Sequence, residues 1–396
     1  MEVFKYDEKR VTRINVFMKK LLAASNTDEK VKIFKEYEKD ILELNPLDIF
    51  YLDFYSNNSN LSIKEIKDSA NRFVNVFHNG INKHSKLRDH ALFNELLAEN
   101  RRMETTLAQI KQYYNRDEIL SYKAELLRIF EKCLAFENKF IKFENIIFPN
   151  LEQKLPSTKP LEVLWELHDD ARVMLKEIIK SLNSKSLDIE RLIKDIGTYH
   201  YLIFGINQKE EIILLPVANQ ILDDNELNRI YNETLEIGYV FCENDLEPIT
   251  TDSMAKNLGF FMTETGKVSF EQLTSMLNTL PFDITFVDKD DYVCYYNDNK
   301  NRHFPRTPSV IGRLVKNCHP PKSVHVVEAI ISDFKSGKKD FEEFWIEFRG
   351  KLLYISYYAI RDENNHYLGV LEVSQDITRF REINGEKRLR DEFEES

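Results

Sequence analysis

The hydrophobic period of the chain changes near residue 268, and this change constrains the fold more than any other feature. Before it, apolar residues recur every three or four positions, as they do on one face of a helix. After it, short runs rich in Val, Ile, Tyr and Phe are bounded by Asp, Asn, Lys and Gly, which is typical of β-strands. We therefore predict a multidomain chain in which an all-α region precedes an α+β domain with an antiparallel sheet.

We predict that the helical region consists of a small domain followed by a bundle. Glycine and proline are scarce, with 11 of each in 396 residues, which favours long helices. Amphipathic helices joined by short loops indicate an up-down-up-down four-helix bundle. The predicted helices are 90–114, 117–148, 160–182, 187–215 and a further one at 224–238. The predicted parts are a small helical domain at 1–84, the bundle at 85–245, a linker at 246–267, the α+β domain at 268–383 and a charged tail at 384–396.

Charge and cysteine content exclude several classes of protein. The net charge is −11, and no basic stripe offers a surface for nucleic acid. The four cysteines include no Cys-x-x-Cys pair, so neither a disulfide framework nor a cysteine-rich zinc site is predicted. The N-terminus is charged, and no run of 18 apolar residues is present, so we expect a cytoplasmic protein with no membrane partner. No phosphate loop, kinase signature or G-x-S-x-G motif indicates an enzyme.

The bundle contains a short internal repeat that carries carboxylates. FENIIFP places Glu144 five residues before Pro149, and EEIILLP places Glu211 five residues before Pro216. Each glutamate lies at a similar depth of an otherwise apolar helix. Two such helices that face one another would direct both carboxylates into the bundle, as di-iron bundles do with Glu and His.

The segments HALFNELLAEN, KFIKFENIIFP, LWELHDDAR and QKEEIILLP resemble the hemerythrin-like (HHE cation-binding) family. The resemblance implies a non-haem di-iron centre that handles O₂, NO or iron. Nine residues separate His90 from Glu99, so both can bind one site only if His90 lies at the start of its helix. The metal ligands carried over from the family are His90, Glu99, Glu144, His168 and Glu211.

The sequence departs from the family where histidines are often found. Lys139 and Phe140 stand four or five residues before Glu144, and Ile206 and Asn207 stand at the same spacing before Glu211. The alternative to a metal site is therefore a purely structural bundle. Its glutamates would pair with Lys or Arg, or be protonated through burial.

The C-terminal region resembles a PAS domain. LPFDITFVDKDDYVCYYND, a helix at about 322–335 and KLLYISYYAIRDENNHYLGVLEVSQDIT follow the PAS order of two strands, helices and three strands. The first 80 residues resemble the small helical domain that precedes hemerythrin-like and PAS domains in some bacterial proteins. The PAS resemblance implies a cavity that binds haem, flavin or a small metabolite.

The segment Asn-Cys-His-Pro-Pro at 317–321 is a candidate cofactor site. Its prolines fix an extended entry to the following helix and would hold Cys318 and His319 at the mouth of the PAS cavity. Cys318, His319 or, in reserve, His325 could be the axial ligand of a haem iron. The alternative is a rigid helix entry in which His319 is a cap or hydrogen-bond partner.

We expect a sensor of redox state, gas (O₂ or NO), metal or haem, which acts on a downstream protein that the sequence does not identify. The alternatives are a di-iron protein for nitric-oxide detoxification or iron-sulfur cluster repair, and a metal-free scaffold. The helix before the first PAS strand predicts a homodimer because its apolar residues share one face. These residues are Phe270, Leu273, Met276, Leu277 and Leu280.

Overall fold

The computed structural model describes residues 5–53, 67, 76–84, 86–113, 119–242, 246–249, 260–263, 265–300 and 302–385. The chain divides into two compact units, a helical unit (Met1–Ser253 with Thr307–Ser309) and a sheet unit (Met254–Arg306 with Val310–Ser396). Half of the predicted linker and most of the charged tail lie outside the described residues. Within the described ranges, no helix is long and apolar enough to cross a membrane.

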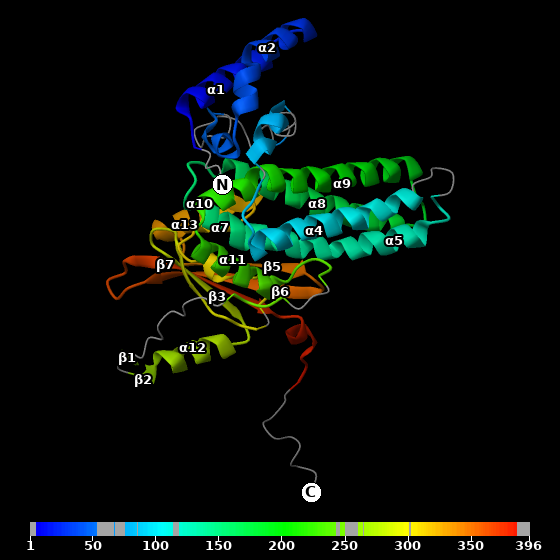
Figure 1. Cartoon of the computed structure of the whole chain (residues 1–396). Coiled ribbons are helices and arrows are strands. Elements are labelled where there is room, and N and C mark those ends of the chain that lie inside the picture. Colours follow the sequence, from blue (N-terminus) through cyan, green and yellow to red (C-terminus); the bar gives the residue numbers. More distant parts are fainter. Residues whose placement is uncertain are drawn as a thin grey trace. The chain divides into compact units, whose positions relative to one another are not determined.

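The helical unit contains the predicted bundle, whose long helices lie side by side (Figure 1). Their order along the chain agrees with the order predicted from the periodicity, and α8 and α9 pack against each other along their length. The helical segments are α4 (Ala91–Ala108), η4 (Gln109–Tyr113), α5 (Lys123–Lys132), η5 (Cys133–Phe136), α6 (Glu137–Lys142), η6 (Phe143–Ile147), α7 (Phe148–Glu152), α8 (Lys159–Asn183), α9 (Ile189–Lys209), η7 (Glu210–Leu214), α10 (Leu215–Ile221) and α11 (Asp224–Ile237).

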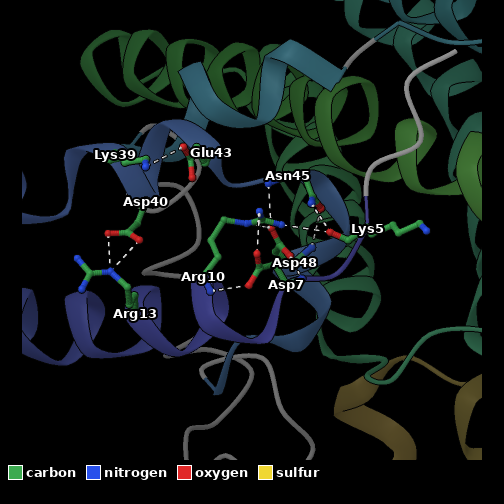
Figure 2. Close-up of polar contacts among 9 residues, drawn as sticks. All are labelled: Lys5, Asp7, Arg10, Arg13, Lys39, Asp40, Glu43, Asn45 and Asp48. Atoms are coloured by element: carbon green, nitrogen blue, oxygen red, sulfur yellow. Dashed lines mark hydrogen bonds and ion pairs between the residues drawn. The ribbon is translucent and has the colours of Figure 1, made fainter.

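The region before the bundle begins with α1 (Glu8–Ala23), α2 (Thr27–Glu43) and the 3-10 segment η1 (Pro46–Tyr51). Asn45 and Asp48 form a capping box at the start of η1, in which each side chain accepts a hydrogen bond from the backbone N–H of the other. The carboxylate of Asp48 is buried and also accepts from Nε of Arg10 at 2.7 Å (Figure 2). One aspartate therefore ties α1 to η1. The short 3-10 segment η3 (Asn82–His84) comes next among the described elements and precedes the bundle along the chain.

The sheet unit is built on a five-stranded antiparallel sheet in the order β4-β3-β7-β6-β5. The apolar runs of the sequence form these strands to within a residue or two. The strands are β3 (Asp283–Asp288), β4 (Val293–Tyr296), β5 (Phe341–Phe348), β6 (Lys351–Arg361) and β7 (Tyr367–Asp376).

Helices cover one face of this sheet and leave a core between them. Val287, Val370 and Ile331 pack there with Phe334, which is fully buried. The predicted long helix is α13, and the helix before the first PAS strand is α12. The helical segments of this unit are α12 (Phe270–Thr279), η9 (Val315–Cys318), α13 (Pro321–Lys335) and η10 (Arg379–Glu382). The short segment η8 (Pro308–Val310) spans the boundary between the units, since residues 308 and 309 belong to the helical unit.

A short hairpin spans the end of the predicted linker and the two residues after it. Strands β1 (Phe260–Thr263) and β2 (Gly266–Ser269) pair antiparallel just before α12. The apolar residues of β1 occur in too short a run for a clear period, which is why the pattern of residues 244–267 did not indicate a strand.

Candidate functional site

The repeat recognised in the sequence forms two π-helical turns, η6 and η7, one in each of two bundle helices. Each turn closes with an i→i−5 hydrogen bond, from Phe148 N–H to the Phe143 carbonyl and from Leu215 N–H to the Glu210 carbonyl. The proline that follows each turn has no N–H with which to continue the regular ladder. Because such turns often lie at functional sites, the side chains around them define the candidate site.

The first cluster in the bundle is centred on His168 of α8. Its Nδ1 lies 2.9 Å from Oε1 of Glu144, and the ring is fully buried. Arg172 donates to both carboxylate oxygens of Glu144, at 2.8 and 2.9 Å. Phe140 and Phe148 stack on the imidazole ring, with centroids 4.4 and 6.0 Å from it. Glu144 and His168 are therefore brought together, but an arginine already neutralises the carboxylate.

The second cluster is a fully buried ion pair between Lys139 and Glu210. Their charged atoms are 2.7 Å apart, and Lys139 also donates to Oδ1 of Asn207 at 2.6 Å. Burial opposes ionisation of Glu210, but its interactions with Lys139 and His168 outweigh it and lower the pKa of that carboxyl. Oε1 of Glu210 lies 3.8 Å from Nε2 of His168, which is too long for a hydrogen bond.

The third cluster is the buried pair of Lys142 and Glu99, also at 2.7 Å. Lys142 donates in addition to the carbonyl of Gly238, and Glu99 accepts from the N–H of Val240 at 2.7 Å. Burial lowers the pKa of Lys142, and Glu99 opposes that shift only in part. This pair therefore anchors the backbone that follows α11.

The other residues proposed as metal ligands have local structural partners. His90 is the N-cap of α4: its Nδ1 accepts from Leu92 N–H, and its Nε2 lies 3.0 Å from Oδ1 of Asn228. Glu211 accepts from the side chain of Asn100 at 3.0 Å, and burial raises the pKa of its carboxyl. The carboxylate near His168 on that helix is Glu210, one residue before the glutamate that the repeat had indicated.

The side chains of the bundle interior do not fit a metal centre. Each carboxylate near His168 has its own cation, and Phe140 occupies a position where the family often has a histidine. A divalent ion beside Glu210 would be repelled by the ammonium group of Lys139. Nowhere in the described ranges do three His, Cys, Asp or Glu side chains form a group that could hold a metal ion.

In the sheet unit, the three residues proposed for haem differ in environment. Nδ1 of His319 donates to the carbonyl of Val315 at 2.9 Å, and burial lowers the pKa of the imidazole. Cys318 is half-buried and packs against the core, whereas His325 is exposed on α13. The hydrogen bond to Val315 is the interaction that the structural alternative for His319 predicted.

Buried polar groups surround this part of the sheet unit. Burial and the nearby carboxylate of Glu372 raise the pKa of Tyr357 well above its usual value. Arg302 donates to the carbonyl of Asn297 at 2.8 Å and to Oγ1 of Thr285 at 2.9 Å. Its guanidinium carbon lies 5.3 Å from the ring centre of Tyr296.

A surface cleft of about 620 Å³ lies between η9, α13 and the turn before β4. Its lining combines apolar side chains with charged groups of both signs, and none of the three residues proposed for haem contributes to it. The lining residues are Asp291, Leu314, Val315, Lys316, Glu328, Ile331, Ser332, Lys335 and Ser336. Sequence reasoning missed this cleft because its residues come from three separate segments with no common motif.

Comparison with known proteins agrees with both parts of the fold. A model of the hemerythrin HHE cation binding domain matches residues 87–218, and a PAS domain model matches residues 273–378. No curated protein matches the chain significantly.

Solved structures match the chain in part. The C-terminal domain of a Streptococcus mutans protein is 39% identical over 33% of this chain and 100% of its own, with a TM-score of 0.31. The PAS domain of a Colwellia psychrerythraea protein is 18% identical over 28% of this chain and 97% of its own, with a TM-score of 0.22. The PAS domain of Bordetella pertussis BvgS is 19% identical over 27% and 85%, with a TM-score of 0.23.

Proposed function

We propose that this chain, which joins a hemerythrin HHE domain to a PAS domain, is a signalling protein whose PAS domain receives a small polar ligand. The observation that carries this proposal is the cleft between η9 and α13. Its volume, about 620 Å³, lies within the range of roughly 300–1,000 Å³ that is usual for small-molecule sites. The bundle enters the proposal as a relay and not as the detector, because its buried carboxylates are already paired.

The lining of the cleft indicates the class of ligand. Leu314, Val315 and Ile331 provide apolar contact, while lysines and acidic residues lie together around them. Lys335 and Asp291 form an ion pair at 2.7 Å that a ligand with both charges could exchange for its own contacts. A zwitterion such as a free amino acid fits this arrangement better than a ligand of a single charge.

A hydrogen bond connects the cleft to the interior of the sheet unit. Val315 lines the cleft, and its carbonyl accepts from His319. His319 in turn is close enough to Glu372 of β7 for that carboxylate to influence its pKa. A ligand that moves η9 would therefore change the surroundings of a strand at the centre of the sheet.

The test is a thermal-shift titration of the full chain with each standard free amino acid. Ser332 lines the cleft, whereas Val326 is exposed on the same helix and does not. We expect at least one amino acid to raise the melting temperature of the wild type and of Val326→Trp but not of Ser332→Trp, whose indole fills the cleft. No shift with any of them, or an equal shift in Ser332→Trp, would contradict the proposal.

Haem-based detection of redox state or gas is the second candidate, and the protonation of His319 favours it. Because Nδ1 carries the donated proton and burial favours the neutral ring, the lone pair lies on Nε2, the form that binds haem iron. Bound haem would supply a redox-active iron that binds gases.

A haem titration of the full chain tests this candidate. We expect a Soret band that shifts in His319→Ala and is unchanged in His325→Ala, since His325 is exposed. Cys318→Ser reports whether the thiolate is the ligand instead. The candidate fails if no band develops or if all three variants match the wild type.

We further propose that a second copy of the chain is the partner of the sheet unit. The apolar face of α12 has no buried residue, and Met276 on it is 58% exposed. Trp345 on β5 is 63% exposed, and Phe341 and Tyr358 are exposed on the same face of the sheet. A twofold dimer would bury these apolar side chains against a second copy.

Sedimentation velocity over a range of concentrations tests the dimer. We expect Met276→Glu to shift the wild-type dimer towards monomer. Val173→Glu is the matched control, because Val173 is 59% exposed on α8 of the bundle. A wild-type monomer at all concentrations would disprove the dimer.

A further inference from the structure

The interior of the bundle disagrees with the description of the family that its fold matches. The family is described as cation binding, yet ammonium groups lie beside the buried carboxylates of this chain. We propose that Lys139 and Lys142 are the cations of this domain. The bundle then keeps its structure without a metal ion, and iron is not a component of the working protein.

The pairing of charges is the first argument. Lys139 with Glu210 and Lys142 with Glu99 are fully buried pairs, each with its charged atoms 2.7 Å apart. Side chains of opposite charge therefore cancel without an added ion. A divalent cation would bring two further positive charges into a region of low dielectric, where like charges repel strongly.

The donor set is the second argument. His168 uses Nδ1 in its contact with Glu144, so only Nε2 remains for a metal. Glu144 is held by both arms of Arg172. Nε2 of His168 and the carboxylate of Glu210 are too few for a protein metal site, which needs three or four protein donors.

The third argument is that Lys142 cannot leave without disturbing the backbone. Its ammonium donates to the carbonyl of Gly238 and lies 4.3 Å from the ring centre of Tyr239. Its partner Glu99 accepts from Val240 N–H, and Arg102 donates to the carbonyl of the same residue at 2.8 Å. A metal that displaced Lys142 would take this donor from the carbonyl of Gly238 and would leave the carboxylate of Glu99, which holds Val240, without its ammonium partner; both changes are costly.

Metal analysis of the full chain tests the proposal. The protein is produced in medium with added iron, zinc and manganese, analysed by mass spectrometry for metals, and then titrated with Fe(II) without oxygen and with Zn(II). We expect far less than stoichiometric metal, and no rise in melting temperature with either ion. Glu210→Gln and His168→Ala should leave the metal content unchanged.

Stoichiometric metal that is lost in Glu210→Gln or His168→Ala would overturn the proposal. The control is His366→Ala, because His366 is exposed in the sheet unit. Metal that persists in both bundle variants binds elsewhere and agrees with the proposal. If His168→Ala does not fold, the metal content of the wild type and of the conservative Glu210→Gln decides the question.

Hydrogen exchange gives an independent measurement of the role of Lys142. In Lys142→Met we expect the amide of Val240 to lose protection by a factor of ten or more, on the order of one lost charge-assisted hydrogen bond. Lys180→Met, on the exposed face of α8, should leave that amide unchanged. Equal protection of Val240 in both variants would show that Lys142 does not hold this segment, and would overturn its assigned role.

Discussion

The two units of the molecule bury charged and polar side chains in different ways. In the helical unit, Lys139, Lys142 and Arg172 are each met by a carboxylate from another part of the bundle. In the sheet unit, Arg302 and His319 are met mainly by backbone carbonyls. The reason is local structure: a helix uses its own carbonyls internally, so a charge buried among helices needs another side chain. The loops of the sheet unit leave carbonyls available for side chains.

This difference also separates what the two units can do. A bundle whose buried charges cancel one another has little capacity left for a ligand. A domain whose polar side chains hold loops in place responds when those loops move. The comparison therefore favours the sheet unit as the receiver of a signal, and substitutions that remove one side of each interaction can test it.

The largest loss of stability is expected for Lys139→Met. The substitution leaves Glu210 buried without its cation, which should lower the free energy of unfolding by about 3–5 kcal/mol. The double variant Lys139→Met/Glu210→Met removes both charges and should recover most of this loss. Urea denaturation measures both, with Lys180→Met on the exposed face of α8 as the control. If Lys139→Met left the free energy of unfolding unchanged, the pairing would not stabilise the bundle.

A smaller effect of about 3 kcal/mol is expected for Arg302→Met, because several acceptors lose their donor. Here no second substitution should restore stability, since the partners include the backbone carbonyls of Asn297 and Phe304. Thr285→Val added to Arg302→Met removes one of its side-chain acceptors, the other being Oδ1 of Asn297. Denaturation should show the double variant to be no more stable than Arg302→Met. Recovery comparable to that of the bundle pair would remove the distinction between the units.

Much of the fold followed from the sequence. The period change located the sheet, and β3 and β5 begin and end where the apolar runs do. The FENIIFP/EEIILLP repeat marked the two π-helical turns, although it did not predict their geometry. These features depend on local pattern, which a single sequence contains.

The arrangement of the candidate site could be predicted from the sequence only in part. Glu144 and His168 lie together as the family resemblance implied, while Glu210 lies near His168 where Glu211 had been proposed. Lys142 was not singled out, because a lysine in a helix is usually a solvated residue and its burial depends on partners distant in sequence. The pairing of each buried lysine with its glutamate depends on how the helices pack, and the periodicity of a single sequence does not reveal that packing.

The smallest losses of stability are expected for substitutions of Asp48. This residue combines pairing with a charged side chain and hydrogen bonding with the backbone. Its carboxylate accepts from the side chain of Arg10 and from the backbone N–H of Asn45, at 2.7 and 3.0 Å (Figure 2). Asp48→Asn removes the charge but keeps an acceptor for the backbone, whereas Asp48→Ala removes both. We expect losses in the free energy of unfolding of about 1 and about 2–3 kcal/mol, respectively.

The difference between the two Asp48 variants measures the backbone contribution, and the loss in Asp48→Asn measures the contribution of the charge. Arg10→Met is the complementary substitution, and it should resemble Asp48→Asn if the ion pair contributes little beyond its hydrogen bond. If Asp48→Asn costs as much as Asp48→Ala, then pairing with Arg10 dominates, and the region before the bundle follows the charge-pairing of the bundle. If Asp48→Asn is neutral, backbone support dominates and the region resembles the sheet unit, although it is helical. Because the N–H groups at the start of a 3-10 segment have no acceptor within the segment and depend on capping side chains such as Asp48, we expect the backbone contribution to be the larger one.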